Sequence, residues 1–154
     1  MPKLFTIGFT KKSAKQFFEL LKKNGVKKLV DIRINNTSQL AGFAKGQDLE
    51  YFINQIIDIP YIHITDLAPT KELLSDYQNK KVDWIGYQKI FKQLLEKRNV
   101  ATKYKASDFD NACFLCSEEL PDECHRRLVV EFMKDKNSDV QIVHLKSLPS
   151  ESFV

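Results

Sequence analysis

Residues 112–127 read ACFLC, then SEELPDE, then CHRR. The first five residues form an apolar run of strand length, and apolar side chains recur at helical spacing from Asp122 to Lys134. A buried strand that leads through a short turn into a helix is typical of α/β proteins. The sequence therefore predicts a strand at 112–116, a turn that contains Pro121, and a helix over 122–134.

Similar units flank this segment along the chain. Four further apolar runs predict strands, at residues 3–8, 28–33, 61–64 and 140–145. Four segments with apolar side chains at helical spacing predict helices, at residues 13–24, 49–57, 70–77 and 82–98. Because strands alternate with helices, we expect an α/β fold with a mainly parallel sheet of about five strands and helices on both faces. This is a three-layer, Rossmann-like arrangement, with a helical insertion between the third and fourth strands.

Two long connections separate these elements. Residues 35–48 are polar and form a loop long enough to act as a lid, and residues 101–111 read as a polar connector. The length of 154 residues matches a single α/β domain, which we place at residues 1–146. We expect residues 147–154 to form a flexible tail.

Composition narrows the class of protein. The 24 Lys and Arg residues against 20 Asp and Glu give a net charge of +4, spread along the predicted helices, so a nucleic-acid partner is possible but not indicated. No apolar run approaches the roughly twenty residues of a membrane-spanning helix, so we expect no membrane insertion. Three cysteines without a hydrophobic leader segment predict the reducing cytoplasm.

The predicted sheet brings several polar groups to one edge, because the carboxyl ends of parallel strands lie together and bind ligands. The side chains at these strand ends, and at the start of the helix that follows the fourth strand, form the candidate site: Gly8, Thr10, Arg33, Cys116, Ser117, Glu118, Cys124, His125 and Arg126. On the predicted helix His125 points inward over the strand end, whereas Arg127 points to solvent.

These residue types favour thiol chemistry on an anionic substrate. The N-terminal end of a helix attracts anions and stabilises a thiolate in its first turn, where we place Cys124. We therefore predict an enzyme for a small anionic or phosphorylated ligand, which includes nucleotides and components of nucleic acids. In this hypothesis Cys116 or Cys124 is the nucleophile, His125 is its base or acid, and Glu118 orients it or acts as a second acid or base.

The remaining candidate residues would hold the substrate. Arg33 and Arg126 would bind the anion, and Gly8, Thr10 and Ser117 would line the site. Arg33 can also pair with Asp31, which lies two residues away on the same side of the strand. Taken singly, each residue also fits a structural role, because cysteines are common in cores and arginines are usually solvated.

Two alternatives stay open. One is a non-catalytic module that binds an anionic ligand or nucleic acid through the same edge. The other is a metal-binding protein in which Cys116, Cys124 and His125 hold zinc or iron, although no fourth ligand is evident. The pair Cys113 and Cys116 is not such a site, because a spacing of three residues sends the side chains to opposite faces of a strand. Nothing in the sequence requires a cofactor.

Four motifs resemble the family called domain of unknown function 488, over about residues 3–145. They are Thr6-Ile7-Gly8, Asp31-Ile32-Arg33, Cys116-Ser117-Glu118 and Cys124-His125-Arg126-Arg127. The resemblance implies a small intracellular α/β domain in which these motifs form a common site, and it implies no activity.

The chain departs from the usual pattern of that family at two places. Phe9-Thr10 stands where the family commonly has His-Ser, and Leu67-Ala68-Pro69 replaces a glycine-rich turn. A catalytic role for a histidine in the first loop is therefore absent here. The Cys-x-Glu and Cys-His-Arg positions are intact.

Overall fold

A five-stranded, entirely parallel sheet forms the centre of the molecule in the computed structural model, which describes residues 1–36, 42–117, 124–137 and 139–146. Its strands are β1 (Lys3–Gly8), β2 (Lys28–Asp31), β3 (Tyr61–His63), β4 (Ala112–Cys116) and β5 (Gln141–Leu145). They are arranged in the order β3-β2-β4-β1-β5. The predicted parallel sheet is confirmed.

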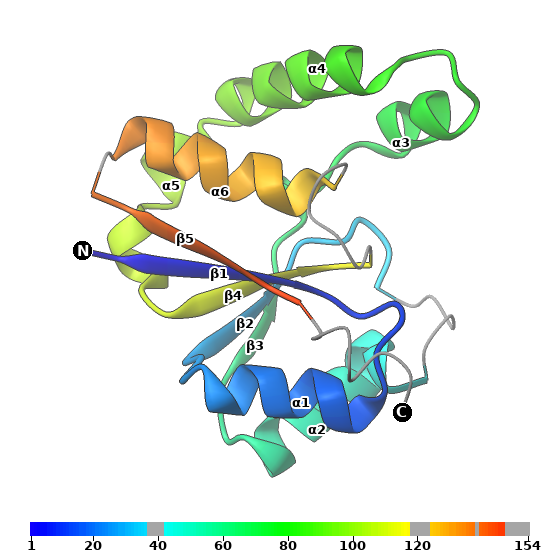
Figure 1. The fold of residues 1–154 in the computed structure, drawn as a ribbon. Helices are drawn as coiled ribbons and strands as arrows, with labels where there is room; N and C mark the ends of the chain where they lie inside the picture. Colours follow the sequence, from blue (N-terminus) through cyan, green and yellow to red (C-terminus); the bar gives the residue numbers. More distant parts are fainter. Residues whose placement is uncertain (37–41, 118–123, 138, 147–154) are drawn as a thin grey trace.

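Helices cover both faces of this sheet, as Figure 1 shows. On one face lie α1 (Ala14–Lys23) and α2 (Gly46–Ile56). On the other lie α3 (Lys71–Gln78), α4 (Trp84–Lys97), α5 (Val100–Lys103) and α6 (His125–Lys136), with α4 packed against α6. The helices between β3 and β4 are the predicted insertion. Within the described part of the chain, no helix is both long and apolar enough to cross a membrane.

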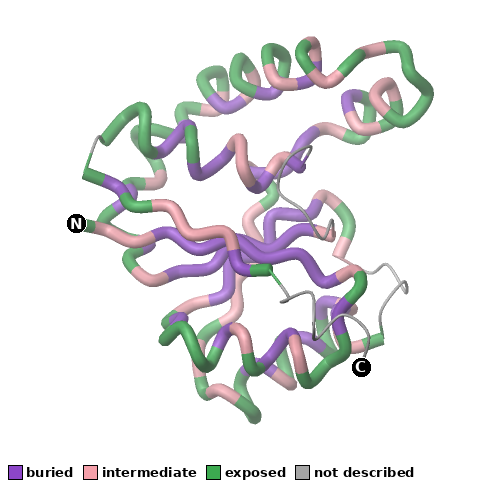
Figure 2. Tube along the Cα trace, viewed as in Figure 1, coloured by how far each residue is buried: buried purple, intermediate pink, exposed green. Residues whose placement is uncertain are grey.

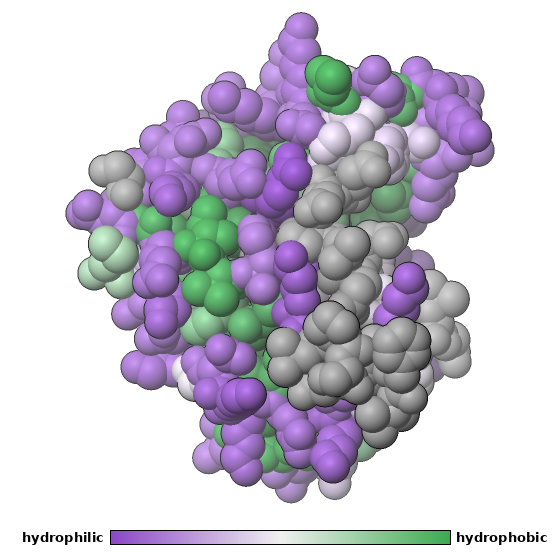
Figure 3. Space-filling view, in the orientation of Figure 1, coloured by the Kyte–Doolittle hydropathy of each residue, from purple (hydrophilic) through white to green (hydrophobic). Residues whose placement is uncertain are grey.

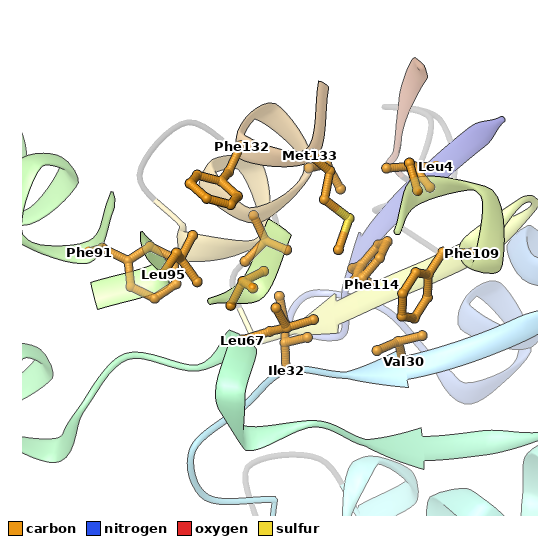
Figure 4. Close-up of a cluster of buried hydrophobic side chains, with 14 of the residues drawn as sticks. Leu4, Val30, Ile32, Leu67, Phe91, Leu95, Phe109, Phe114, Phe132 and Met133 are labelled. Atoms are coloured by element: carbon orange, nitrogen blue, oxygen red, sulfur yellow. The ribbon is translucent and has the colours of Figure 1, made fainter. Parts of the chain in front are cut away.

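Side chains of the strands alternate between two apolar cores. As a result β1, β2 and β4 are largely buried, whereas the edge strands β3 and β5 are mostly half-buried (Figure 2). Val30 and Phe114 point toward α4 and α6 and pack with Phe91 and Phe132 in the cluster of Figure 4. Leu29, by contrast, belongs to the core under α1 and α2. Each such side chain contributes roughly 1.5–3 kcal/mol to folding through burial. The outer surface seen in Figure 3 is largely hydrophilic.

The strand order creates a crevice at one end of the sheet. β4 lies between β2 and β1, and Gly8 at the end of β1 is paired with Cys116 at the end of β4. This order differs from the 3-2-1-4-5 order of a dinucleotide-binding sheet. The chain leaves β1 and β2 toward α1 and α2, and leaves β4 toward α6 on the opposite face. Neighbouring strands whose connections diverge leave room for a ligand at their carboxyl ends.

Several predicted boundaries differ from the structure. β2 ends at Asp31, two residues before the predicted end at Arg33. The predicted polar connector contains α5 and a 3₁₀ turn at Ala106–Phe109. Cys124 is the N-cap residue of α6, with extended backbone angles of φ −132° and ψ 139°, so it precedes the first turn in which the sequence placed it. The predicted helix start at Asp122 lies outside the described residues, as does the predicted tail.

The predicted lid loop is partly helical. A 3₁₀ turn at Gly42–Ala44 leads into α2, which begins at Gly46 and not at Leu49. The backbone N–H of Gly46 donates to the carbonyl oxygen of Asn36 at 2.7 Å, and a Cβ at this position would lie 2.5 Å from Asn36 Nδ2. A larger residue at position 46 would therefore displace the Asn36 side chain, which donates to the Tyr61 hydroxyl.

Candidate functional site

A cavity of about 240 Å³ opens at the carboxyl ends of β1, β2 and β4. Its walls include five of the residues predicted from sequence, namely Arg33, Cys116, Ser117, Cys124 and His125. A larger hollow of about 650 Å³ lies between α1 and the end of β5, but it is lined largely by exposed polar side chains and contains none of these residues. We therefore place the candidate site at the smaller cavity.

Two sulfur atoms lie at this cavity. Cys116, the last residue of β4, and Cys124, the N-cap of α6, are joined by a disulfide, and their Cα atoms are 7.6 Å apart. The sequence offered them as alternative nucleophiles or as joint metal ligands, and did not predict a disulfide between them. Cys113 is free and buried in the core under α1 and α2, on the opposite face from Cys116, as the strand spacing predicted.

A fully buried guanidinium lies against both sulfurs. Arg126 Nη1 is 3.4 Å from Cys116 Sγ and 3.8 Å from Cys124 Sγ, and Arg126 Nε donates to Thr6 Oγ1 at 3.3 Å. A cation this close offsets part of the free energy that burial costs a thiolate here once the disulfide is reduced. The sequence predicted that Arg126 contacts the substrate. In the structure its guanidinium lies against the two sulfurs and is not among the residues that line the cavity. Arg127, which the sequence placed in solvent, is instead only 25% exposed: its guanidinium lies 5.7 Å from the centre of the Trp84 ring and pairs with Glu131 at 3.2 Å.

His125 points inward, as its helical position predicted. Its Nε2 lies 2.7 Å from the carbonyl oxygen of Ile32, so Nε2 carries the proton and donates, which leaves the Nδ1 lone pair. The ring also meets Phe91 edge-on at 5.8 Å. Burial lowers the pKa of His125 to about 4, and the neighbouring Arg126 adds to this effect. The imidazole is therefore neutral near pH 7.

Arg33 and Asp31 form a buried ion pair. Arg33 Nε and Nη2 donate to the two carboxylate oxygens of Asp31 at 2.9 and 2.7 Å, and both side chains are at most 6% exposed. Nη2 also donates to the carbonyl oxygen of Ala44, and the guanidinium lies 5.3 Å from the centre of the Phe9 ring. The remaining nitrogen, Nη1, is buried and has no hydrogen-bond partner among the described residues.

Two residues that the sequence did not single out complete this ion pair. The hydroxyl of Tyr61 donates to Asp31 Oδ2 at 2.6 Å, and Asn36 Nδ2 donates to the Tyr61 hydroxyl at 3.1 Å. Burial and the Asp31 carboxylate both raise the pKa of Tyr61. A buried carboxylate needs several hydrogen-bond donors. The position of Asp31 within an apolar strand was therefore the sequence feature that could have indicated donors such as Tyr61.

The remaining predicted residues connect neighbouring strand ends. Thr10 donates from its backbone N–H and from Oγ1 to the carbonyl oxygen of Ser117, at 3.1 and 2.8 Å. Gly8 ends β1 beside Cys116. Thr10 and Gly8 thus hold the β1 and β4 ends together, and Ser117 lines the cavity. Glu118 lies outside the described residues.

The helical insertion contributes an aromatic wall. Tyr77, Trp84 and Tyr87 line the cavity, and the rings of Trp84 and Tyr87 stack with centroids 5.0 Å apart. None of the three is among the site residues predicted from the sequence. They face the site because the insertion folds back over the end of the sheet.

Comparison with curated proteins and with solved structures gives no significant match. A family model does match, over residues 13–133, which is most of the chain. The match spans the Asp31-Ile32-Arg33, Cys116-Ser117-Glu118 and Cys124-His125-Arg126-Arg127 motifs, three of the four on which the resemblance rested. The chain therefore belongs to the family described as domain of unknown function DUF488.

Proposed function

We propose that this protein is a cytoplasmic enzyme that uses the reduced Cys116/Cys124 pair to act on a small anionic or phosphorylated substrate. The observation that carries the proposal is the fully buried Arg126 guanidinium, 3.4 and 3.8 Å from the two sulfurs at the cavity. In the reducing cytoplasm the pair exists as thiols, and disulfides that do form there are mostly catalytic or redox-sensing.

Arg126 is the group that activates the thiols. A guanidinium stays protonated at all working pH values, so it stabilises a thiolate nucleophile without a proton transfer of its own. His125 is less suited to this task, because a pKa of about 4 makes it a weak proton acceptor at pH 7. We therefore assign His125 to positioning through its bond to Ile32. Cys124, at the N-cap of α6, also benefits from the helix dipole.

Arg33 provides the contact for an anionic group. Arg33 lines the cavity, and its Nη1 is buried without a hydrogen-bond partner among the described residues, which costs free energy. An anionic oxygen in the cavity would accept this bond and recover that cost. The pairing with Asp31 keeps the guanidinium in place without a ligand. This arrangement favours a small substrate that presents one anionic group beside the sulfurs.

Thiol labelling of the reduced protein tests the proposal. Iodoacetamide is applied near pH 7 in the presence of a chelator, with and without inorganic phosphate, and each cysteine is quantified by peptide mass spectrometry. We expect Cys116 or Cys124 to label faster than in the urea-unfolded chain and phosphate to slow that labelling. Arg126→Gln should abolish the enhanced rate, and Arg33→Gln should abolish the protection by phosphate.

Cys113 is the internal control in every sample. Cys116 and Cys124 are only 1% and 4% exposed but line the cavity, whereas Cys113 lies in the core away from it and should stay unlabelled while the protein is folded. Rates at Cys116 and Cys124 no higher than in the unfolded chain would exclude thiol catalysis. Protection by phosphate that persists in Arg33→Gln would exclude the assigned anion contact.

A further inference from the structure

We infer that the reduced protein binds one zinc ion through Cys116, Cys124 and His125, with the fourth coordination position open to the cavity. One sulfur from each cysteine and a ring nitrogen of His125 lie within 4.8 Å of one another. Two thiolates and an imidazole are donors that zinc prefers. The inference goes beyond the proposed function, because it describes a zinc-loaded state in which both sulfurs are shielded, whereas the proposed thiol chemistry belongs to the reduced, zinc-free protein.

The backbone positions of the two cysteines suit such a site. Zinc–sulfur bonds of about 2.3 Å in a tetrahedral arrangement place two sulfurs about 3.8 Å apart. The Cα atoms of Cys116 and Cys124 are 7.6 Å apart, beyond the roughly 4.4–6.8 Å usual for disulfides. Rotation of the two reduced side chains can therefore open the space for an ion between the sulfurs without a backbone shift.

The groups around the three ligands have the character of an outer coordination shell. A zinc-bound histidine commonly donates its other ring N–H to a backbone carbonyl, which fixes the ring. His125 makes this contact from Nε2 to the Ile32 oxygen at 2.7 Å, so Nδ1 is the nitrogen left to ligate. Arg126 Nη1 lies close enough to both sulfurs to donate to the thiolates, as outer-shell groups do.

The fourth position distinguishes this site from a structural zinc centre. Three protein ligands with an open position are the pattern of catalytic zinc, where water or substrate completes the tetrahedron. Here Cys116, Cys124 and His125 all line the 240 Å³ cavity, which has room for a water molecule or an anionic oxygen.

Zinc and the disulfide are alternative states of the same sulfurs. Binding converts two thiols and one Zn²⁺ into a zinc dithiolate and releases two protons, with no change of oxidation state. The oxidised pair has no thiolate to offer. Zinc should therefore bind only after reduction, and it should shield both sulfurs from alkylation.

Metal titration of the full chain in the presence of a non-thiol reductant tests the inference. Zinc is quantified by elemental analysis after removal of free metal, and Co²⁺ serves as the spectroscopic probe. We expect one zinc per chain and a sulfur-to-cobalt charge-transfer band. Cys116→Ser and Cys124→Ser should each remove roughly half of that band, and His125→Ala should weaken zinc binding roughly tenfold or more. The matched control Cys113→Ser should behave like the wild type.

A second measurement needs no substitution and so does not depend on whether the variants fold. Zinc should protect Cys116 and Cys124 of the wild-type protein from iodoacetamide, as read by peptide mass spectrometry. A wild-type protein that retains no zinc, or labelling that zinc leaves unchanged, would overturn the inference. Labelling of the zinc-free protein tests the proposed thiol enzyme separately, so the two ideas can fail independently.

Discussion

Replacing Asp31 with Asn should lower the free energy of unfolding by about 3–5 kcal/mol, because it leaves the Arg33 guanidinium buried without its counter-charge. Asp31 is fully buried and accepts from Arg33 Nε, Nη2 and the backbone N–H of Arg33 at 2.9, 2.7 and 3.1 Å. The Tyr61 hydroxyl adds a fourth bond at 2.6 Å. Asparagine keeps one acceptor oxygen, but its NH₂ group replaces the other. That group is itself a donor, so it cannot accept the hydrogen bonds that the lost carboxylate oxygen accepted.

A double-mutant cycle separates the charge effect from simple loss of packing. Arg33→Gln removes the cation, so the variant with both substitutions carries no unpaired buried charge. We expect it to be more stable than the sum of the single effects predicts, by about 2 kcal/mol or more. Asp135→Asn, at an exposed position on α6, is the matched control and should change stability by less than about 0.5 kcal/mol.

Urea unfolding at pH 7 provides the assay. Trp84 is the only tryptophan of the chain and packs against Tyr87, so its fluorescence reports unfolding, with circular dichroism as a second probe. A loss below about 1 kcal/mol in Asp31→Asn would contradict the reasoning. Strictly additive effects in the cycle would show that the two charges do not stabilise one another.

Three further outcomes are expected. Burial lowers the pKa of His125 to about 4, so between about pH 6.5 and pH 4 the unfolded chain takes up a proton that the folded protein does not. The free energy of unfolding of the zinc-free protein, measured with urea, should therefore fall by up to about 3 kcal/mol over this range. An equal fall in His125→Gln would contradict this reasoning. Burial raises the pKa of Cys113, so this thiol should resist iodoacetamide at pH 8 until urea unfolds the protein, as mass spectrometry will show. Phe114→Ala should cost about 3–5 kcal/mol in urea unfolding, whereas Ile85→Ala, at an exposed site, should cost less than about 0.5 kcal/mol; similar costs would argue against the core assignment.

The strands and the longer helices could be predicted from sequence because each strand is a short apolar run and each of these helices has a periodic apolar face, whereas the four-residue α5 has none. The alternation of strands and helices then favoured parallel pairing, which the structure confirms. The strand order could not be predicted in the same way. Apolar patterning shows that Leu29 and Phe114 are buried, but it does not show that β4 lies between β2 and β1.

For the candidate site, the sequence could predict only which residues lie together at the carboxyl ends of the strands. Strand ends brought Arg33 and Cys116 together, as the cavity lining shows. The direction of each side chain depends on contacts that no short pattern encodes. Arg126 lies behind the sulfurs because the first turn of α6 packs onto β1 at Thr6, and Tyr61 reaches Asp31 from a neighbouring strand.

The central place of β4 has a consequence for biosynthesis. A ribosome makes β1, β2 and β3 before residues 112–116 emerge, so the nascent chain holds two strands whose future neighbour does not yet exist. Until then β1 and β2 have unpaired edges, and the sheet can close only through contacts distant in sequence, which slows folding. The same late segment brings Cys116. A nascent chain that has not reached residue 116 therefore lacks both the strand that joins β1 to β2 and the first sulfur of the cavity, whose wall Cys124 and His125 complete when α6 follows.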